Sequence, residues 1–138
     1  MAAQESEAVP DLVLVDSSYY ITLHRQNRDP FVELEQFEHD YDFAINGVIW
    51  AEVVRGRSDP HVRRRYERAF TVARMLSLTA RGWQRVAELA WALDRRGDVI
   101  PLTDLIIAVT AIEYGAALLT FDRHFERIPG LVALPDLT

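Results

Sequence analysis

Short apolar runs alternate with segments of helical periodicity along this chain, and this alternation restricts the possible folds more than any other feature of the sequence. The runs that are short and apolar enough to be buried strands cover residues 12–15, 43–45, 75–78, 117–121 and 131–134. The segments between them that carry helical signals begin at Ser17, Pro30, Val48, Pro60, Thr79, Leu105 and Asp122. Strands that alternate with helices predict one α/β domain with a parallel sheet and helices on both faces.

Several helix ends can be assigned from single residues. Pro60 suits a first helical turn, Thr79 can cap the helix that follows it, and Gly115 suits the end of the segment 105–114. That segment is apolar nearly all round, so we expect a central helix that is buried on most sides. In the helix after Thr79 the predicted apolar positions are Trp83, Val86, Ala87, Ala90 and Leu93.

The length of 138 residues is that of one domain, with 49% hydrophobic residues to form its core. We expect a flexible leader over residues 1–10 and a folded domain over 11–138. The leader lacks the basic start and apolar run of a signal peptide, and the longest apolar run, 105–112, is too short to span a membrane. The sequence therefore predicts a cytoplasmic protein with no membrane association.

Four acidic residues, Asp16, Glu52, Asp104 and Asp122, each lie within or at the edge of an apolar segment. Carboxylates in such positions are costly unless a cation or hydrogen-bond donors hold them. Asp16 and Asp122 directly follow predicted strands, so we expect both at the carboxyl edge of the sheet, where ligands bind in such folds.

Each acid also has a structural interpretation. Asp16 and Asp122 could cap helices, Asp104 could interact with a helix dipole, and Glu52 could pair with Arg55. Together, however, four close carboxylates would repel by roughly 4 kcal/mol per pair at an effective dielectric constant near 20. A divalent cation would remove this repulsion, and carboxylate oxygens suit Mg²⁺ or Mn²⁺.

The formal charge of −6 argues against binding nucleic acid by overall charge. All 15 basic residues are nevertheless arginines, and a stretch of twenty residues contains seven of them, namely Arg55, Arg57, Arg63, Arg64, Arg65, Arg68 and Arg74. Because the chain has no lysine and no cysteine, mechanisms that need either side chain are excluded. The arginine cluster is either a solvated helix face or a surface for RNA phosphates or an acidic partner.

Together, these segments resemble a PIN domain, the nuclease fold of VapC-type toxins in toxin-antitoxin pairs. The matching segments are LVLVDSS with Asp16, WAEVVRG with Glu52, GDVIPLTDLIIAVTAIEYGAALLTFDRHF with Asp104 and Asp122, and the closing IPGL. The resemblance covers roughly residues 11–134, and the long third segment is its most specific part.

This resemblance implies a sheet of about five parallel strands and an endoribonuclease site in which Asp16, Glu52, Asp104 and Asp122 bind Mg²⁺ or Mn²⁺. It implies a supporting role for Thr120, and we expect Ser17 and Asn46 to support the site too, although many relatives carry serine or threonine in place of Asn46. It further implies a homodimer and a small cognate antitoxin. The arginines expected to bind RNA or a partner are Arg55, Arg57, Arg64, Arg65 and Arg68.

Two other functions stay open at this point. A PIN-like domain without catalysis could act as a binding or dimerisation module, although the presence of all four acids argues against it. A phosphoacceptor signalling domain also uses acids at strand ends, but such sites typically need a lysine. His124 beside Asp122 could contact substrate or be a surface histidine.

Overall fold

The computed structural model describes residues 9–138, which contain one parallel sheet of five strands in the order β3-β2-β1-β4-β5. The strands are β1 (Leu12–Val15), β2 (Asp42–Ile45), β3 (Arg74–Met75), β4 (Ala117–Leu119) and β5 (Ala133–Leu134). The central strand β1 is the core of the fold, since Val13, Leu14 and Val15 have no exposed surface. Most of the expected leader, residues 1–8, lies outside the described residues.

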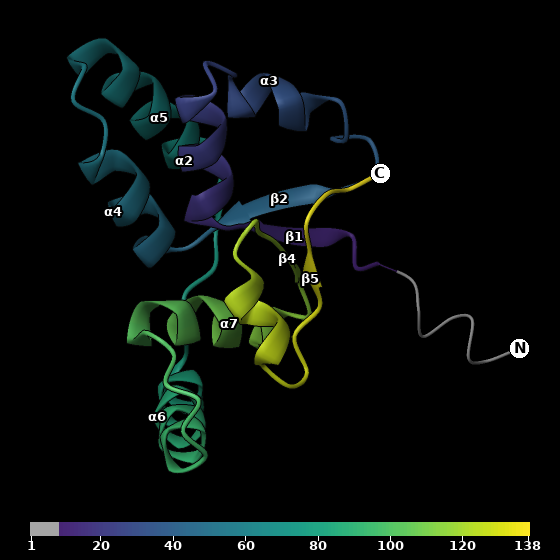
Figure 1. Ribbon diagram of the computed structural model, residues 1–138. Helices are drawn as coiled ribbons and strands as arrows, with labels where there is room; N and C mark the ends of the chain where they lie inside the picture. Colours follow the sequence, from purple (N-terminus) through teal and green to yellow (C-terminus); the bar gives the residue numbers. More distant parts are fainter. Residues whose placement is uncertain (1–8) are drawn as a thin grey trace, which may run out of the picture.

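Helices cover both faces of the sheet, as Figure 1 shows. One face carries α2 (Ser17–Arg25), α3 (Pro30–Glu35), α4 (Gly47–Arg55) and α5 (Pro60–Val72), and the other carries α6 (Ala80–Arg95), α7 (Leu102–Tyr114) and the 3-10 helix η1 (Arg123–Arg127). This division follows from the right-handedness of parallel crossovers, because the chain moves from β1 to β3 in one direction and then returns across β1 to β4. The predicted α/β fold is confirmed.

The change of direction occurs between β1 and β4, which lie side by side in the sheet. A place where the strand order changes direction is called a topological switch point. There, the connections that follow the two neighbouring strands lead to opposite faces of the sheet, and a crevice forms beyond the carboxyl ends of these strands. The first residue after β1 is Asp16, and Thr120 and Asp122 come shortly after β4. The topology therefore brings the two ends of the folded chain together at the expected site.

The outer strands and one helix are shorter than the sequence predicts. Of the run 75–78 only Met75 lies in a strand, because β3 spans Arg74–Met75, and of the run 131–134 only Ala133 and Leu134 form β5. β4 ends at Leu119 because the backbone N–H of Phe121 donates to the Ser18 hydroxyl instead of to a neighbouring strand. The helical segment predicted over 30–41 ends at Glu35 and continues as turns.

The predicted buried face of α6 is wrong at Trp83, which is 52% exposed, and at Ala87. α6 packs against α7 through Gly82, which is buried together with Val86 and Leu93. A Cβ atom at Gly82 would lie 2.7 Å from a Glu113 carboxylate oxygen and 2.9 Å from Leu78 Cδ2, so a larger residue would require these side chains to shift. The predicted burial of α7 is confirmed for most of its length, and Gly115 ends that helix with a φ of 66°.

Within residues 9–138, no helix is both long and apolar enough to cross a membrane.

Candidate active site

Asp16 lies at the carboxyl end of β1 and is buried, with 3% of its surface exposed. Its backbone N–H donates to the carbonyl of Leu119 on β4 at 2.9 Å, which fixes the residue between the two central strands. Its carboxylate caps α2 by accepting the N–H of Ser18 at 3.3 Å, and it also accepts the Thr120 hydroxyl at 2.9 Å. Asp16 is therefore a helix cap, and its carboxylate has a second, tertiary partner.

The hydroxyl of Thr120 connects the two halves of the site. It donates its single hydrogen to Asp16, so it accepts from its other neighbours, the N–H of Asp122 at 3.0 Å and the Ser18 hydroxyl at 3.1 Å. Ser18 Oγ in turn accepts the N–H of Phe121 at 3.0 Å. The sequence predicts Thr120 as a supporting residue but misses Ser18, whose contribution depends on a contact between residues far apart in the chain.

Glu52 projects from the middle of α4 and is half-buried. Within residues 9–138 it forms no ion pair, neither with Arg55 nor with another cation, and its carboxylate accepts the Ser17 hydroxyl at 3.0 Å. Asn46 caps the same helix by accepting the N–H of Ile49 at 2.9 Å. Ser17 thus contacts an acid directly, whereas Asn46 supports Glu52 only through the helix that carries it.

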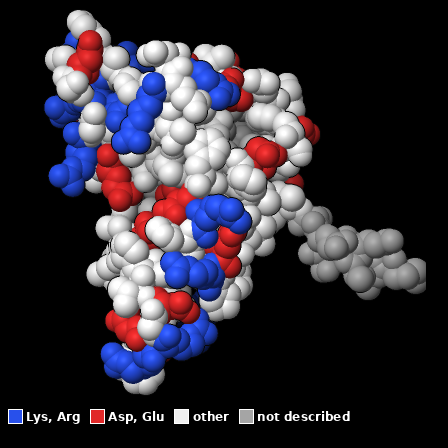
Figure 2. Space-filling model, viewed as in Figure 1, with Lys and Arg blue, Asp and Glu red and all other residues white. Residues whose placement is uncertain are grey.

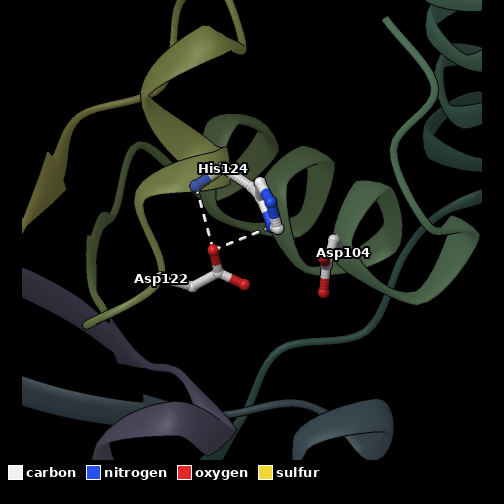
Figure 3. Close-up of side chains that lie close together, drawn as sticks. All are labelled: Asp104, Asp122 and His124. Atoms are coloured by element: carbon white, nitrogen blue, oxygen red, sulfur yellow. Dashed lines mark hydrogen bonds and ion pairs between the residues drawn. The ribbon is translucent and has the colours of Figure 1, made fainter.

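The side chains of Asp104 and Asp122 lie close together, next to His124, as Figure 3 shows. One potential ligand atom from each of these three residues lies within 4.8 Å of the others. Asp122 caps η1 by accepting the N–H of His124 at 2.9 Å, and the same oxygen lies 3.0 Å from Nδ1 of the His124 ring. His124 is exposed, so it borders the open side of this cluster.

The pKa of Asp104 is raised from 3.8 to about 6. Burial is the largest cause, and the charges of Asp122, Asp16 and Glu52 raise this pKa further, while His124 lowers it. The other three acids predicted from the sequence therefore all lie near enough to Asp104 for their charges to act on it, although Asp16 and Glu52 are not part of the tightest cluster. Such a set of carboxylates has the chemistry of a site for a hard divalent cation, which would remove the repulsion that raises this pKa.

The predicted arginine cluster lies over α4 and α5, and acidic residues gather nearer the middle of the same face (Figure 2). Some of these arginines have partners within the chain: Arg65 pairs with Asp29 at 2.6 Å, and Arg64 contacts His61 at 2.9 Å. Arg57 is half-buried above the ring of Tyr66. Arg55 and Arg68 are exposed, which makes them the most available of the predicted binding residues.

Comparison with known families agrees with this geometry. The family model for the PIN domain matches residues 13–131. This chain belongs to the PIN domain family. No curated protein matches this PIN domain.

Solved structures with the same fold include toxins of toxin-antitoxin pairs. VapBC2 from Rickettsia felis, bound to a DNA fragment from its promoter, has 23% identity and a TM-score of 0.75 over 89% of this chain and 97% of that chain. A toxin-antitoxin complex from Klebsiella pneumoniae has 29% identity and a TM-score of 0.63 over 87% and 95% of the two chains. VapC20 from Mycobacterium tuberculosis, a sarcin-ricin loop cleaving toxin, has 16% identity and a TM-score of 0.61 over 83% and 92%. The predicted resemblance to VapC-type PIN domains is confirmed.

Proposed function

We propose that this PIN domain is a metal-dependent endoribonuclease and the toxin of a toxin-antitoxin pair. The observation that carries the proposal is the convergence of the four acids at the switch point of the sheet: Asp104 and Asp122 lie in one cluster with His124, and Asp16 and Glu52 lie near enough for their charges to act on Asp104. Supporting it, the similar structures include toxin-antitoxin complexes and an RNA-cleaving toxin.

The four carboxylates would hold Mg²⁺ or Mn²⁺, which suit carboxylate oxygens. When bound, such an ion activates a water molecule and stabilises negative charge on the phosphate of the RNA. The chain itself orients the carboxylates: Thr120 and Ser18 fix Asp16, and Ser17 fixes Glu52. No side chain of this site needs to act as a nucleophile, which agrees with the absence of cysteine and lysine.

The partners follow from the same proposal. The substrate is RNA, and the exposed Arg55 and Arg68 are the arginines best placed to bind its phosphates. The toxins of the similar structures occur with antitoxins, which supports a small cognate antitoxin for this chain, and we propose a homodimer. An assignment to the cytoplasm belongs to the same proposal.

The direct test is cleavage of a labelled single-stranded RNA by the purified chain with Mg²⁺ or Mn²⁺ and with excess EDTA. We expect cleavage only with the metal, and loss of cleavage in Asp104→Asn and Glu52→Gln. Asp40→Asn is the matched control, because Asp40 is an exposed acid in the turn after α3. Cleavage that persists in both site variants would refute the assignment of the site, and a wild-type chain without metal-dependent cleavage would support a binding module instead.

A further inference from the structure

Phe121 is an aromatic residue that comes directly before Asp122 and is 40% exposed. The next aromatic residue in the sequence, Phe125, is 1% exposed and belongs to the core. The two residues flank the same acid, but only Phe125 is accounted for by packing. Phe121 therefore presents an aromatic surface to solvent directly beside an acid of the proposed metal site.

The ring of Phe121 is held in place from one side. Tyr19 stacks against it with a centroid distance of 5.3 Å and an interplanar angle of 30°, and Tyr19 is itself only 9% exposed. The backbone N–H of Phe121 is bound by Ser18, which belongs to the hydrogen-bond network around Asp16. The orientation of the ring is therefore coupled to the acidic site, as a preorganised binding residue requires.

Two hollows border this ring. One, of about 410 Å³, is also lined by Tyr19 and Arg28, and the other, of about 320 Å³, is also lined by Thr120, Asp122 and Arg123. Volumes of this size match small-molecule binding sites. The second hollow combines an aromatic wall, an acid of the proposed metal site and an exposed ion pair between Arg123 and Glu126 at 3.5 Å.

We propose that Phe121 is a stacking platform for a nucleobase of single-stranded RNA, placed next to the phosphate that is cleaved. The inference rests on the proposed ribonuclease function and adds the residue that positions the substrate. A base in the second hollow would extend the stack formed by Tyr19 and Phe121, and the exposed Arg123 would exchange its partner Glu126 for a neighbouring phosphate. Because Phe121 and Asp122 line the same hollow, a base on Phe121 would lie beside one acid of the proposed metal site. Stacking tolerates any base, so this contact positions RNA without selecting its sequence.

The test compares Phe121→Leu, which keeps apolar bulk, with Phe121→Trp, which keeps an aromatic face. Loss of one base stack weakens binding by about 5- to 150-fold. We expect Phe121→Leu to raise the KM for a single-stranded RNA by about tenfold with little change in kcat, and Phe121→Trp to restore the wild-type KM. Trp91→Leu is the matched control, because Trp91 is an aromatic residue of α6 that is 63% exposed. The Mg²⁺-induced rise in melting temperature should be the same in all of these variants, since none removes an acid.

A wild-type KM in Phe121→Leu, or an equal rise in Phe121→Leu and Phe121→Trp, would overturn the proposal. A second measurement separates it from the proposed function. Each variant at position 121 is combined with Asp104→Asn, which blocks cleavage, and is mixed with Mg²⁺ and an oligoribonucleotide that contains the fluorescent base 2-aminopurine. The fluorescence of this base should be quenched by protein with Phe121 or with Trp at this position, and not by protein with Leu. If the wild-type chain cleaves no RNA but the quenching depends on the aromatic ring, the nuclease proposal fails and the base site stands. If quenching is absent throughout, the base site fails as well.

Discussion

Replacing Asp104 by asparagine should stabilise the metal-free protein, because it removes a carboxylate whose ionisation is opposed by its surroundings. At about 1.4 kcal/mol per pH unit, the rise of the pKa from 3.8 to about 6 corresponds to about 3 kcal/mol. Asp104 is partly exposed, so solvent screens these interactions and we expect about 1 kcal/mol. For a chain of this length, that gain raises the melting temperature by about 4 °C.

The gain should depend on pH in one direction. The folded state binds the Asp104 proton more tightly than the unfolded chain does, so the raised pKa favours folding below about pH 4. This contribution is lost as the pH rises through about 6, and the wild type is then weakened relative to Asp104→Asn. The difference in melting temperature should therefore be small at pH 4 and reach its full size above pH 6.

Thermal unfolding in EDTA between pH 4 and pH 8 tests this reasoning, with Asp40→Asn as the control for loss of an exposed acid. Adding Mg²⁺ should raise the melting temperature of the wild type and leave that of Asp104→Asn nearly unchanged. A variant that is less stable than the wild type above pH 6, or a difference that does not vary with pH, would show that the acids do not repel one another as inferred.

The remaining predictions concern the hydrogen-bond network, the second acid and the arginines. Thr120→Val should lower the free energy of unfolding by about 2 kcal/mol, because the buried carboxylate of Asp16 loses a hydrogen-bond donor. Urea denaturation measures this loss, and Thr120→Ser, which keeps the hydroxyl, should be close to wild type in stability. Ser17→Ala should reduce RNA cleavage less than Glu52→Gln does, because it frees the Glu52 carboxylate without removing it, and equal losses would contradict this order. The double variant Arg55→Ala, Arg68→Ala should weaken RNA binding at low salt. It should also lower the magnitude of the slope of log binding constant against log salt concentration by up to about 1.4. An unchanged slope would exclude these arginines from the phosphate contacts.

The sequence predicts the central part of the fold because its signals are local. Asp16 follows an apolar run that forms a buried strand, whichever strands lie beside it in the sheet. Gly115 provides the residue with left-handed backbone conformation that ends α7. These signals place Asp16 at the edge of the sheet, and the position of Asp122 after β4 follows in the same way. The PIN resemblance rests on the same residues, which explains why fold and family are predicted together.

The features that the sequence does not predict depend on contacts between distant segments. The buried side of α6 is set by Gly82, which lies against Glu113 of α7, and a periodic pattern that contains Trp83 gives no sign of this. The contribution of Ser18 depends on its proximity to Thr120 after β1 and β4 have paired. The roles of the four acids in metal binding and catalysis stay predictions, because the geometry brings the residues together without testing their activity.

The pairing of β1 with β4 also determines when the site can exist during synthesis of the chain. A nascent chain that has emerged as far as Ala116 contains Asp16, Glu52 and Asp104, but lacks β4, Thr120 and Asp122. Asp16 then has neither the Leu119 carbonyl nor the Thr120 hydroxyl that fix it in the folded protein. For a chain with the proposed activity, this order delays the assembly of the cleaving site until the segment through Asp122 has left the ribosome, because a shorter nascent chain lacks one acid and two partners of another.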